Sequence, residues 1–299
     1  MKLSLGPIQY YWDRGTVFDY YREVEDLPVD IVYLGETVCS KRRALRPEDW
    51  LEIGERLAAT GKEVVLSTLT LIESESEVSA MRRVIENGRF AVEANDLGAV
   101  NMAHGKRFVS GPHINVYNLE ALALMAEAGA RRWVVPFELS RTMLEKILAA
   151  RPAGIETEML AFGRLPLAFS ARCFTARAYN LPKDDCGFRC RDYPEGMPLQ
   201  TQEQKTFLTV NGIQVQSAAV YSLLGEIEDL RALGVDVLRL APPLPRATAE
   251  VIRSFRAVLD GRQAPAEAGA QIARLAQVDL CDGYWHGLPG MNPSHGAAG

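Results

Sequence analysis

The sequence predicts a (β/α)₈ barrel of the TIM type. Short apolar, β-branched runs alternate with amphipathic stretches from Lys2 to Leu259, and eight such runs read as strands. Parallel strands need helical crossovers, and eight is the number that closes a barrel. A doubly wound open sheet shows the same alternation and remains the alternative. Although 299 residues leave room for two domains, we predict one barrel domain over residues 1–299.

The first half of the chain carries five of the predicted strands and two clear helices. The first helix starts at a proline and stops at Gly61, and the second is acidic in its first turn and stops at Asn87-Gly88. The strands are Lys2–Leu5, Asp30–Gly35, Glu63–Leu69, Phe90–Ala94 and Arg107–Ser110, and the helices are Pro47–Thr60 and Glu73–Asn87.

The second half carries the remaining three strands and four helices. Asn118 is the expected N-cap of the first of these helices, which ends near Ala128. The strands are Trp133–Phe137, Ile155–Leu160 and Val235–Leu240, and the other helices are Arg141–Ala150, Tyr221–Leu233 and Thr248–Leu259.

This alternation is interrupted by an irregular insertion at about residues 164–217. Within it, Asn211-Gly212 between apolar runs predicts a β-hairpin with a type I′ turn. Because the insertion follows the seventh strand, it should lie near the C-terminal face of the barrel, where barrel enzymes carry their chemistry. A Gly- and Pro-rich tail at about residues 282–299 is expected to be loose.

Composition excludes several classes of protein. With 33 basic and 38 acidic residues the net charge is −5, and 47% of residues are hydrophobic, which argues against a disordered chain or a strongly basic nucleic-acid binder. An odd count of five cysteines does not suit a disulfide scaffold. Neither a signal peptide nor an 18-residue apolar run is visible, so we predict a cytoplasmic protein without a transmembrane segment.

Four of the cysteines form a candidate metal site. Cys39 follows the second strand, and Cys173, Cys186 and Cys190 are spaced C-x12-C-x3-C within the insertion, so all four fall near one rim of the predicted barrel. Four thiolates can hold an iron–sulfur cluster or a zinc ion, and unrelated buried thiols are the third interpretation. Basic residues around these cysteines would lower thiolate pKa values, or they are simply solvated. Cys281 is expected to be a buried small hydrophobe.

Further polar residues follow predicted strands, where a barrel binds its ligand. Glu36, Asn95, Asn115 and Glu138 are in this position. Glu36 is either an acid–base group or the partner of a neighbouring arginine. His104 and His113 lie near the same rim, where ordinary surface histidines are also common.

At the segment Leu34–Arg42 (LGETVCSKR) and the four-cysteine pattern, the sequence resembles the collagenase-like peptidase family. The resemblance covers nearly the whole chain, including Phe207–Gln216 and Asp282–Met291, and is strongest to members of oxygen-independent ubiquinone biosynthesis. Other members hydroxylate RNA bases. Neither H-E-x-x-H nor G-x-S-x-G is present, so the residues do not indicate a peptidase.

The resemblance implies a specific cofactor and specific partners. It implies one [4Fe-4S] cluster on Cys39, Cys173, Cys186 and Cys190, a heterodimer with a UbiU-like relative, and a UbiT-like lipid carrier. The implied complex hydroxylates prenylated phenol precursors without O₂, with prephenate as the hydroxyl donor. Two alternatives stay open, namely a non-catalytic iron–sulfur partner and an RNA-base hydroxylase, and the net charge of −5 disfavours nucleic acid as a partner.

Overall fold

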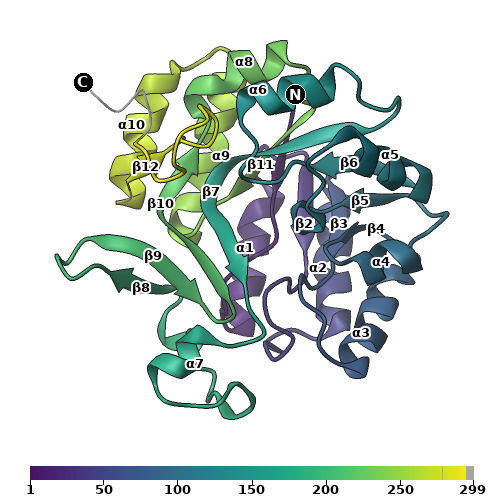
Figure 1. The fold of residues 1–299 in the computed structure, drawn as a ribbon, viewed down its shortest axis with the longest axis vertical. Coiled ribbons are helices and arrows are strands. Elements are labelled where there is room, and N and C mark those ends of the chain that lie inside the picture. Colours follow the sequence, from purple (N-terminus) through teal and green to yellow (C-terminus); the bar gives the residue numbers. More distant parts are fainter. Residues whose placement is uncertain (278, 294–299) are drawn as a thin grey trace.

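The computed structural model describes residues 1–277 and 279–293, and its centre is a closed barrel of eight parallel strands (Figure 1). Each strand pairs with the next, and β11 closes the ring by pairing with both β7 and β1. The predicted (β/α)₈ fold is therefore confirmed. The barrel strands are β1 (Lys2–Leu5), β2 (Ile31–Leu34), β3 (Glu63–Ser67), β4 (Ala91–Ala94), β5 (Phe108–Ser110), β6 (Ala130–Val134), β7 (Glu156–Phe169) and β11 (Val237–Ala241).

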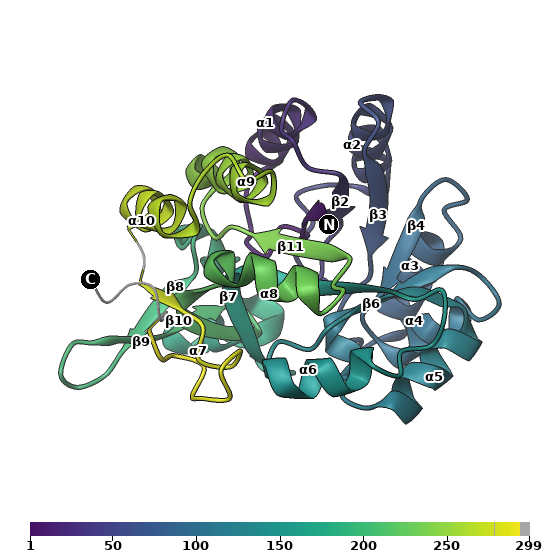
Figure 2. The same ribbon diagram turned by 90° about the horizontal axis from the view of Figure 1, so that it is seen from above.

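Helices surround the barrel, as the view from above shows (Figure 2). None of the helices in residues 1–277 and 279–293 combines the length and apolar character that a bilayer crossing requires. The helices are α1 (Arg14–Glu25), α2 (Pro47–Ala59), α3 (Glu75–Ile85), α4 (Leu97–Met102), α5 (Leu119–Ala128), α6 (Arg141–Leu148), α8 (Ile227–Ala232), α9 (Pro245–Leu259) and α10 (Pro265–Ala276).

Local sequence signals explain where several helices begin. The Asn118 side chain accepts a hydrogen bond from the Ala121 amide at 2.8 Å, which is the N-cap predicted for α5. At α2, Pro47 fixes the first turn, and the Asp49 carboxylate accepts a hydrogen bond from the Arg46 amide at 2.9 Å. These caps position the loops that connect the barrel strands to the helices.

The sixth strand differs from its prediction. It spans Ala130–Val134 rather than Trp133–Phe137, so it begins three residues earlier. Arg132 lies inside the strand although it is charged, because its buried guanidinium forms ion pairs with the partly exposed carboxylates of Glu63 and Glu156. The strand ends before Pro136, which has no amide hydrogen to donate to a neighbouring strand.

The predicted helix Tyr221–Leu233 is also wrong in its first half. Tyr221 and Ser222 belong to β10 (Gln214–Ser222), and Tyr221 pairs with Gly163 of β7. A 3₁₀ turn, η4 (Leu224–Glu226), follows, and α8 begins only at Ile227. Long-range strand pairing outweighs the local helical periodicity here.

The insertion is an antiparallel sheet built on the end of β7. The seventh strand continues to Phe169, beyond the predicted Leu160, and its second half pairs with β10 instead of a barrel strand. β10 pairs with β9 (Thr206–Asn211), and β9 pairs with β8 (Met197–Gln200). Between β7 and β8 lie α7 (Phe174–Ala178), η2 (Lys183–Asp185) and η3 (Arg189–Asp192).

The predicted hairpin exists, but its turn is shifted by one residue. Asn211 pairs with Gln214, so the two central residues are Gly212 and Ile213. Only Gly212 has a positive φ, at 69°, and this is the pattern of a type II′ turn rather than the predicted type I′ turn. Asn211 stays in the strand because its side chain has buried partners, described below.

The described part of the tail packs against the barrel. β12 (Leu280–Cys281) pairs with β10, Trp285 is buried, and the Trp285 carbonyl accepts a hydrogen bond from the Arg141 amide at 2.9 Å. As far as Pro293 the tail contacts the barrel through a buried aromatic side chain and a backbone hydrogen bond, and its looseness stays a prediction. The predicted remainder, 294–299, lies outside the described residues.

Candidate metal centre

Cys39 lies in the loop that follows β2. The loop turns at Gly35, and the Glu36 carboxylate accepts hydrogen bonds from the amides of Val38 at 2.8 Å and Cys39 at 3.0 Å. The side chain of Glu36 thus shapes the turn that carries the cysteine. This loop is at the C-terminal end of the barrel strands, as predicted.

The other three cysteines lie in the insertion. Cys173 is the N-cap of α7, Cys186 ends η2, and Cys190 lies within η3. Lys41, two residues after Cys39, forms an ion pair with Asp184 at 2.8 Å. The insertion and the β2 loop are therefore held together beside the thiols.

The four thiols face the same region. All four residues are half-buried, the charge of Cys173 acts on Cys39, and the charges of Cys173 and Cys186 act on Cys190. Among residues 1–277 and 279–293, no three cysteine Sγ atoms lie within 4.8 Å of one another.

A buried arginine lies beside these thiols. The side chain of Arg42 is 2% exposed, and its guanidinium donates to the Gln9 carbonyl and to the Asn211 amide oxygen, both at 2.7 Å. The nearest carboxylate, Glu36, is 4.0 Å away. Burial opposes the charge of Arg42, but Glu36 and the Cys190 and Cys39 thiolates outweigh it and raise the arginine pKa.

Burial also affects the thiols themselves. It raises the pKa of Cys39 to about 11, although the charge of Arg42 opposes that shift. The pKa of Cys190 is raised for the same reason. Without a bound metal these thiols stay protonated at neutral pH, and a metal would have to supply the charge that favours the thiolate form.

These residues fit an anionic metal–sulfur group. Arg42 Nε is buried and has no hydrogen-bond partner, and a cluster with four thiolates would provide both negative charge and sulfur acceptors at that place. A four-iron cluster is also larger than one ion and spaces its ligands more widely. Cys39, Cys173, Cys186 and Cys190 are the residues that could hold it.

Most of the surrounding basic residues are engaged elsewhere. Lys183 forms an ion pair with Glu73, Arg189 with Asp192 at 3.4 Å, and Arg191 donates to the Tyr11 hydroxyl at 2.8 Å. These contacts lie within or around the insertion rather than at the thiols. The sequence allows two interpretations of the basic residues, as partners of the thiolates or as solvated charges, and neither describes them fully.

The fifth cysteine lies in another part of the fold, on a strand near the C-terminus. Cys281 is fully buried in β12, and burial raises its pKa to about 12. It behaves as the buried small residue that the sequence predicts and provides an internal control for the other four.

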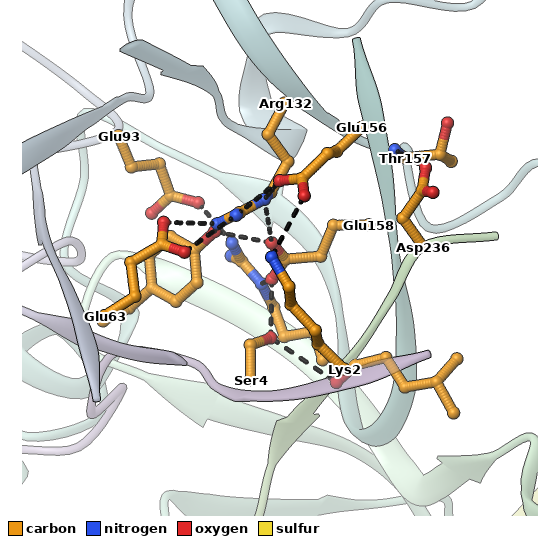
Figure 3. A network of polar contacts seen from close by, with 12 residues as sticks. Lys2, Ser4, Glu63, Glu93, Arg132, Glu156, Thr157, Glu158 and Asp236 are labelled. Carbon is orange, nitrogen blue, oxygen red and sulfur yellow. Dashed lines mark hydrogen bonds and ion pairs between the residues drawn. The ribbon is translucent and has the colours of Figure 1, made fainter. Parts of the chain in front are cut away.

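An ion network that sequence reasoning missed fills the barrel interior (Figure 3). Glu158 is fully buried and accepts hydrogen bonds from Ser4 at 2.7 Å, from Tyr33 at 2.5 Å and from Arg239 at 2.6 Å. Arg239 also lies 2.7 Å from Glu93. The signal was available for Arg239, a charged residue between Leu238 and Leu240 of a predicted strand.

At one end of the barrel this network meets a cluster around Arg132. Its guanidinium pairs with Glu156 at 2.6 Å and with Glu63 at 3.1 Å, and it lies 3.7 Å from Glu158 (Figure 3). The carboxylates raise the pKa values of Arg132 and Arg239 although burial opposes both charges. Each buried charge has an opposite partner, which is the arrangement of a structural core.

The other end of the network opens to a very small cavity at the barrel mouth. Its lining includes Glu93, Asn95, His113, Arg164 and Tyr10, and its volume is about 30 Å³. That space holds one or two water molecules and no aromatic ring. The mouth is therefore filled by the protein's own side chains.

The remaining candidates divide between this cavity and the surface. Asn95 and His113 line the cavity, whereas Asn115, Glu138 and His104 are exposed and do not. Glu138 accepts a hydrogen bond from the Tyr117 hydroxyl at 2.6 Å. Glu36 has the arginine neighbour that one of its two interpretations required.

The fold is that of a (β/α)₈-barrel protein, and the chain belongs to peptidase family U32, whose model matches residues 21–294. Among solved structures it is similar to the U32 peptidase Mk0906, with 13% identity and a TM-score of 0.44 over 81% of this chain and 93% of that one. It is also similar to orotidine 5'-phosphate decarboxylase from Pyrococcus horikoshii OT3, with 12% identity and a TM-score of 0.40 over 92% of this chain and 99% of that one. A third similar structure is that of a rubisco-like protein from Alicyclobacillus acidocaldarius, with 14% identity and a TM-score of 0.48 over 92% of this chain and 67% of that one.

Proposed function

We propose that this U32 protein is UbiV-like, the [4Fe-4S] subunit of an O₂-independent hydroxylase in ubiquinone biosynthesis. Its substrates would be prenylated phenol precursors, its hydroxyl donor prephenate, its partners a UbiU-like relative and a UbiT-like lipid carrier, and its compartment the cytoplasm. The observation that supports this proposal is the set of four half-buried thiols, of which Cys39 and Cys190 lie beside the buried, incompletely paired Arg42. The family match alone does not choose among the activities of the family.

The chain's own residues have definite roles in this proposal. Cys39, Cys173, Cys186 and Cys190 bind the cluster, and Arg42 offsets its negative charge. With four thiolates and no open iron site, a bound cluster supplies electron transfer or rigidity rather than direct binding of substrate. The Lys41–Asp184 pair keeps the β2 loop and the insertion in register for that binding.

One observation favours the alternative of a non-catalytic iron–sulfur partner. The cavity at the barrel mouth is about 30 Å³, which is too small for a substituted phenol. In that alternative the relative carries the reacting ring, and this chain stabilises the heterodimer.

Anaerobic purification of the wild type and five Cys→Ala variants tests the metal site. We expect a full complement of iron and sulfide in the wild type and in Cys281→Ala, and a large loss in each of Cys39→Ala, Cys173→Ala, Cys186→Ala and Cys190→Ala. The measurement is iron and sulfide per chain together with the thiolate-to-iron absorption. Zinc as the bound metal, or full iron in Cys39→Ala, would refute the proposal.

A hydroxylation assay with the relative present separates the two functions. If the cluster takes part in the reaction, the four cysteine variants lose hydroxylation of a prenylated phenol while still pairing with the relative. Activity retained by a cluster-free variant in a stable heterodimer would leave the non-catalytic partner as the function.

A further inference from the structure

A large groove separates two neighbouring helices of the outer ring. α1 packs against α2 and α3 packs against α4, whereas no comparable packing joins α2 to α3 in the described chain (Figure 2). The space between them is a cavity of about 750 Å³. Its size falls within the range of small-molecule sites and contrasts with the 30 Å³ at the barrel mouth.

The groove is mainly apolar. Leu34 and Leu66, at the ends of β2 and β3, lie along it, with Trp50 from α2 and Met81 and Val84 from α3. Leaving such surface open to water costs about 25 cal/mol for each Å². An apolar ligand would recover that free energy.

The groove is bordered by more basic than acidic residues, namely Arg42, Arg43, Arg46 and Arg83 against Glu36 and Glu77. Arg43 and Arg83 both border it, both are exposed, and no ion pair within residues 1–277 and 279–293 involves either of them. Glu36 and Arg42 border it as well, so the groove reaches the loop that carries Cys39. One end of a ligand in the groove would therefore lie beside the loop that carries Cys39.

We propose that this groove binds an amphipathic anion, with its apolar chain between α2 and α3 and with Arg43 and Arg83 at the rim supplying the charge that attracts its anionic group. The occupant we infer is a prenylated phenol that carries a carboxylate. This choice of aromatic head rests on the proposed function, whereas the groove and its charge do not. The site would hold the substrate by its chain, which the barrel mouth has no room to do.

Trp50 provides a direct measurement of binding, because it borders the groove while Trp12, Trp133 and Trp285 are buried elsewhere. The purified chain is titrated with a farnesylated 4-hydroxybenzoate, with oleate and with 4-hydroxybenzoate lacking the chain. For the farnesylated compound we expect a saturable change in Trp50 emission at one ligand per chain. We expect no change with 4-hydroxybenzoate that lacks the farnesyl chain, and no change in the Trp50→Phe variant.

Matched variants locate the ligand. Ala80→Phe fills the groove from α3 and should weaken binding at least tenfold, whereas Ala58→Phe on an exposed part of α2 should bind as the wild type does. Arg43→Ala and Arg83→Ala should each weaken binding about fivefold, which is the upper range for an exposed ion pair, and Arg82→Ala should not. If Ala80→Phe does not fold, the arginine series decides.

Three results would overturn the proposal: wild-type affinity in a folded Ala80→Phe variant, no saturable binding by the wild type, or loss of ligand whenever the UbiU-like relative binds. Oleate binding as tightly as the farnesylated compound would support the groove and overturn the phenol as its occupant. The titration needs neither iron nor turnover. If the chain binds the ligand but holds no cluster, only the proposed function is contradicted. If the chain holds a cluster but does not bind the ligand, only the proposed groove site is contradicted.

Discussion

His113 shows how one residue near the barrel mouth acquires its chemistry. Its ring lies 4.8 Å from the ring of Phe169 and 5.7 Å from that of Phe137, measured between centroids. Burial and the charge of Arg239 lower its pKa to about 3. The imidazole is therefore neutral at physiological pH and can exchange hydrogen bonds but not carry charge.

This shift makes stability depend on pH. Below pH 6.5 the unfolded chain takes up a proton on His113 and the folded chain does not, so the free energy of unfolding falls as the pH is lowered. Between pH 6.5 and 5.5 we expect His113→Asn to reduce this slope by up to about 1.4 kcal/mol per pH unit. The measurement is urea unfolding at each pH.

His104→Asn, at an exposed histidine, is measured in parallel as the control variant. Equal slopes for the wild type and His113→Asn would contradict the burial of His113.

At the residue scale, spacing could locate the four cysteines but not the charges around them. Lys41 and Lys183 look alike in the sequence as solvated cations, and only the tertiary structure shows Asp184 and Glu73 beside them. Likewise, Arg42 stands between Lys41 and Arg43, and nothing in the sequence indicates that Arg42 is the buried residue of the three. Electrostatic partners that are distant in the chain are set by the fold, not by local pattern.

The loop between β2 and α2 depends on one glycine. Gly35 has a φ of 124°, and a Cβ built there would lie 2.7 Å from the Ser67 carbonyl oxygen of β3. This glycine therefore allows two neighbouring strands to end close together, and the Cys39 loop begins from that point.

Gly35→Ala should consequently destabilise the protein more than a positive φ alone explains. Gly61→Ala is the matched control, since Gly61 has a φ of 86° and no heavy atom within 4 Å of its Cβ position. We expect the control to cost about 1–2 kcal/mol and Gly35→Ala clearly more. Thermal or urea unfolding measures both, and equal costs would show that the loop adapts.

At the element scale, the sequence predicted most barrel strands and helices but failed where distant pairing decides. Helices with caps, such as α5 behind Asn118, were located closely. The second halves of β7 and β10 were not, because these residues are strands by virtue of long-range pairing, in part with each other. The apolar run at Tyr221 has a helical period, and local pattern cannot reveal a partner that lies elsewhere in the chain.

The whole barrel depends on balanced charges in its interior. Glu158→Gln would remove the fully buried carboxylate that Arg239 and Arg132 share, which leaves Arg239 with Glu93 alone and Arg132 with partly exposed carboxylates, and we expect a loss of about 3–5 kcal/mol. Glu156→Gln removes a carboxylate that is 37% exposed and should cost at most about 1 kcal/mol. Urea midpoints at constant slope compare the two. Similar costs would show that water reaches the interior.

At the scale of the molecule, alternation of strands and helices was sufficient to predict the barrel. It was not sufficient to predict how the barrel is filled or where it is open. The filled mouth and the groove between α2 and α3 arise from side chains contributed by many elements, and no single segment encodes either of them.

The length of β7 has a consequence for how the protein opens. The first half of β7 is a barrel strand between β6 and β11. Its second half pairs with β10, which carries the hairpin. Because one unbroken strand serves both sheets, the insertion cannot detach without breaking hydrogen bonds that continue into the barrel. Barrel and thiol-bearing insertion should therefore unfold as a single foldon, and a metal bound at the insertion would slow the opening of the whole protein.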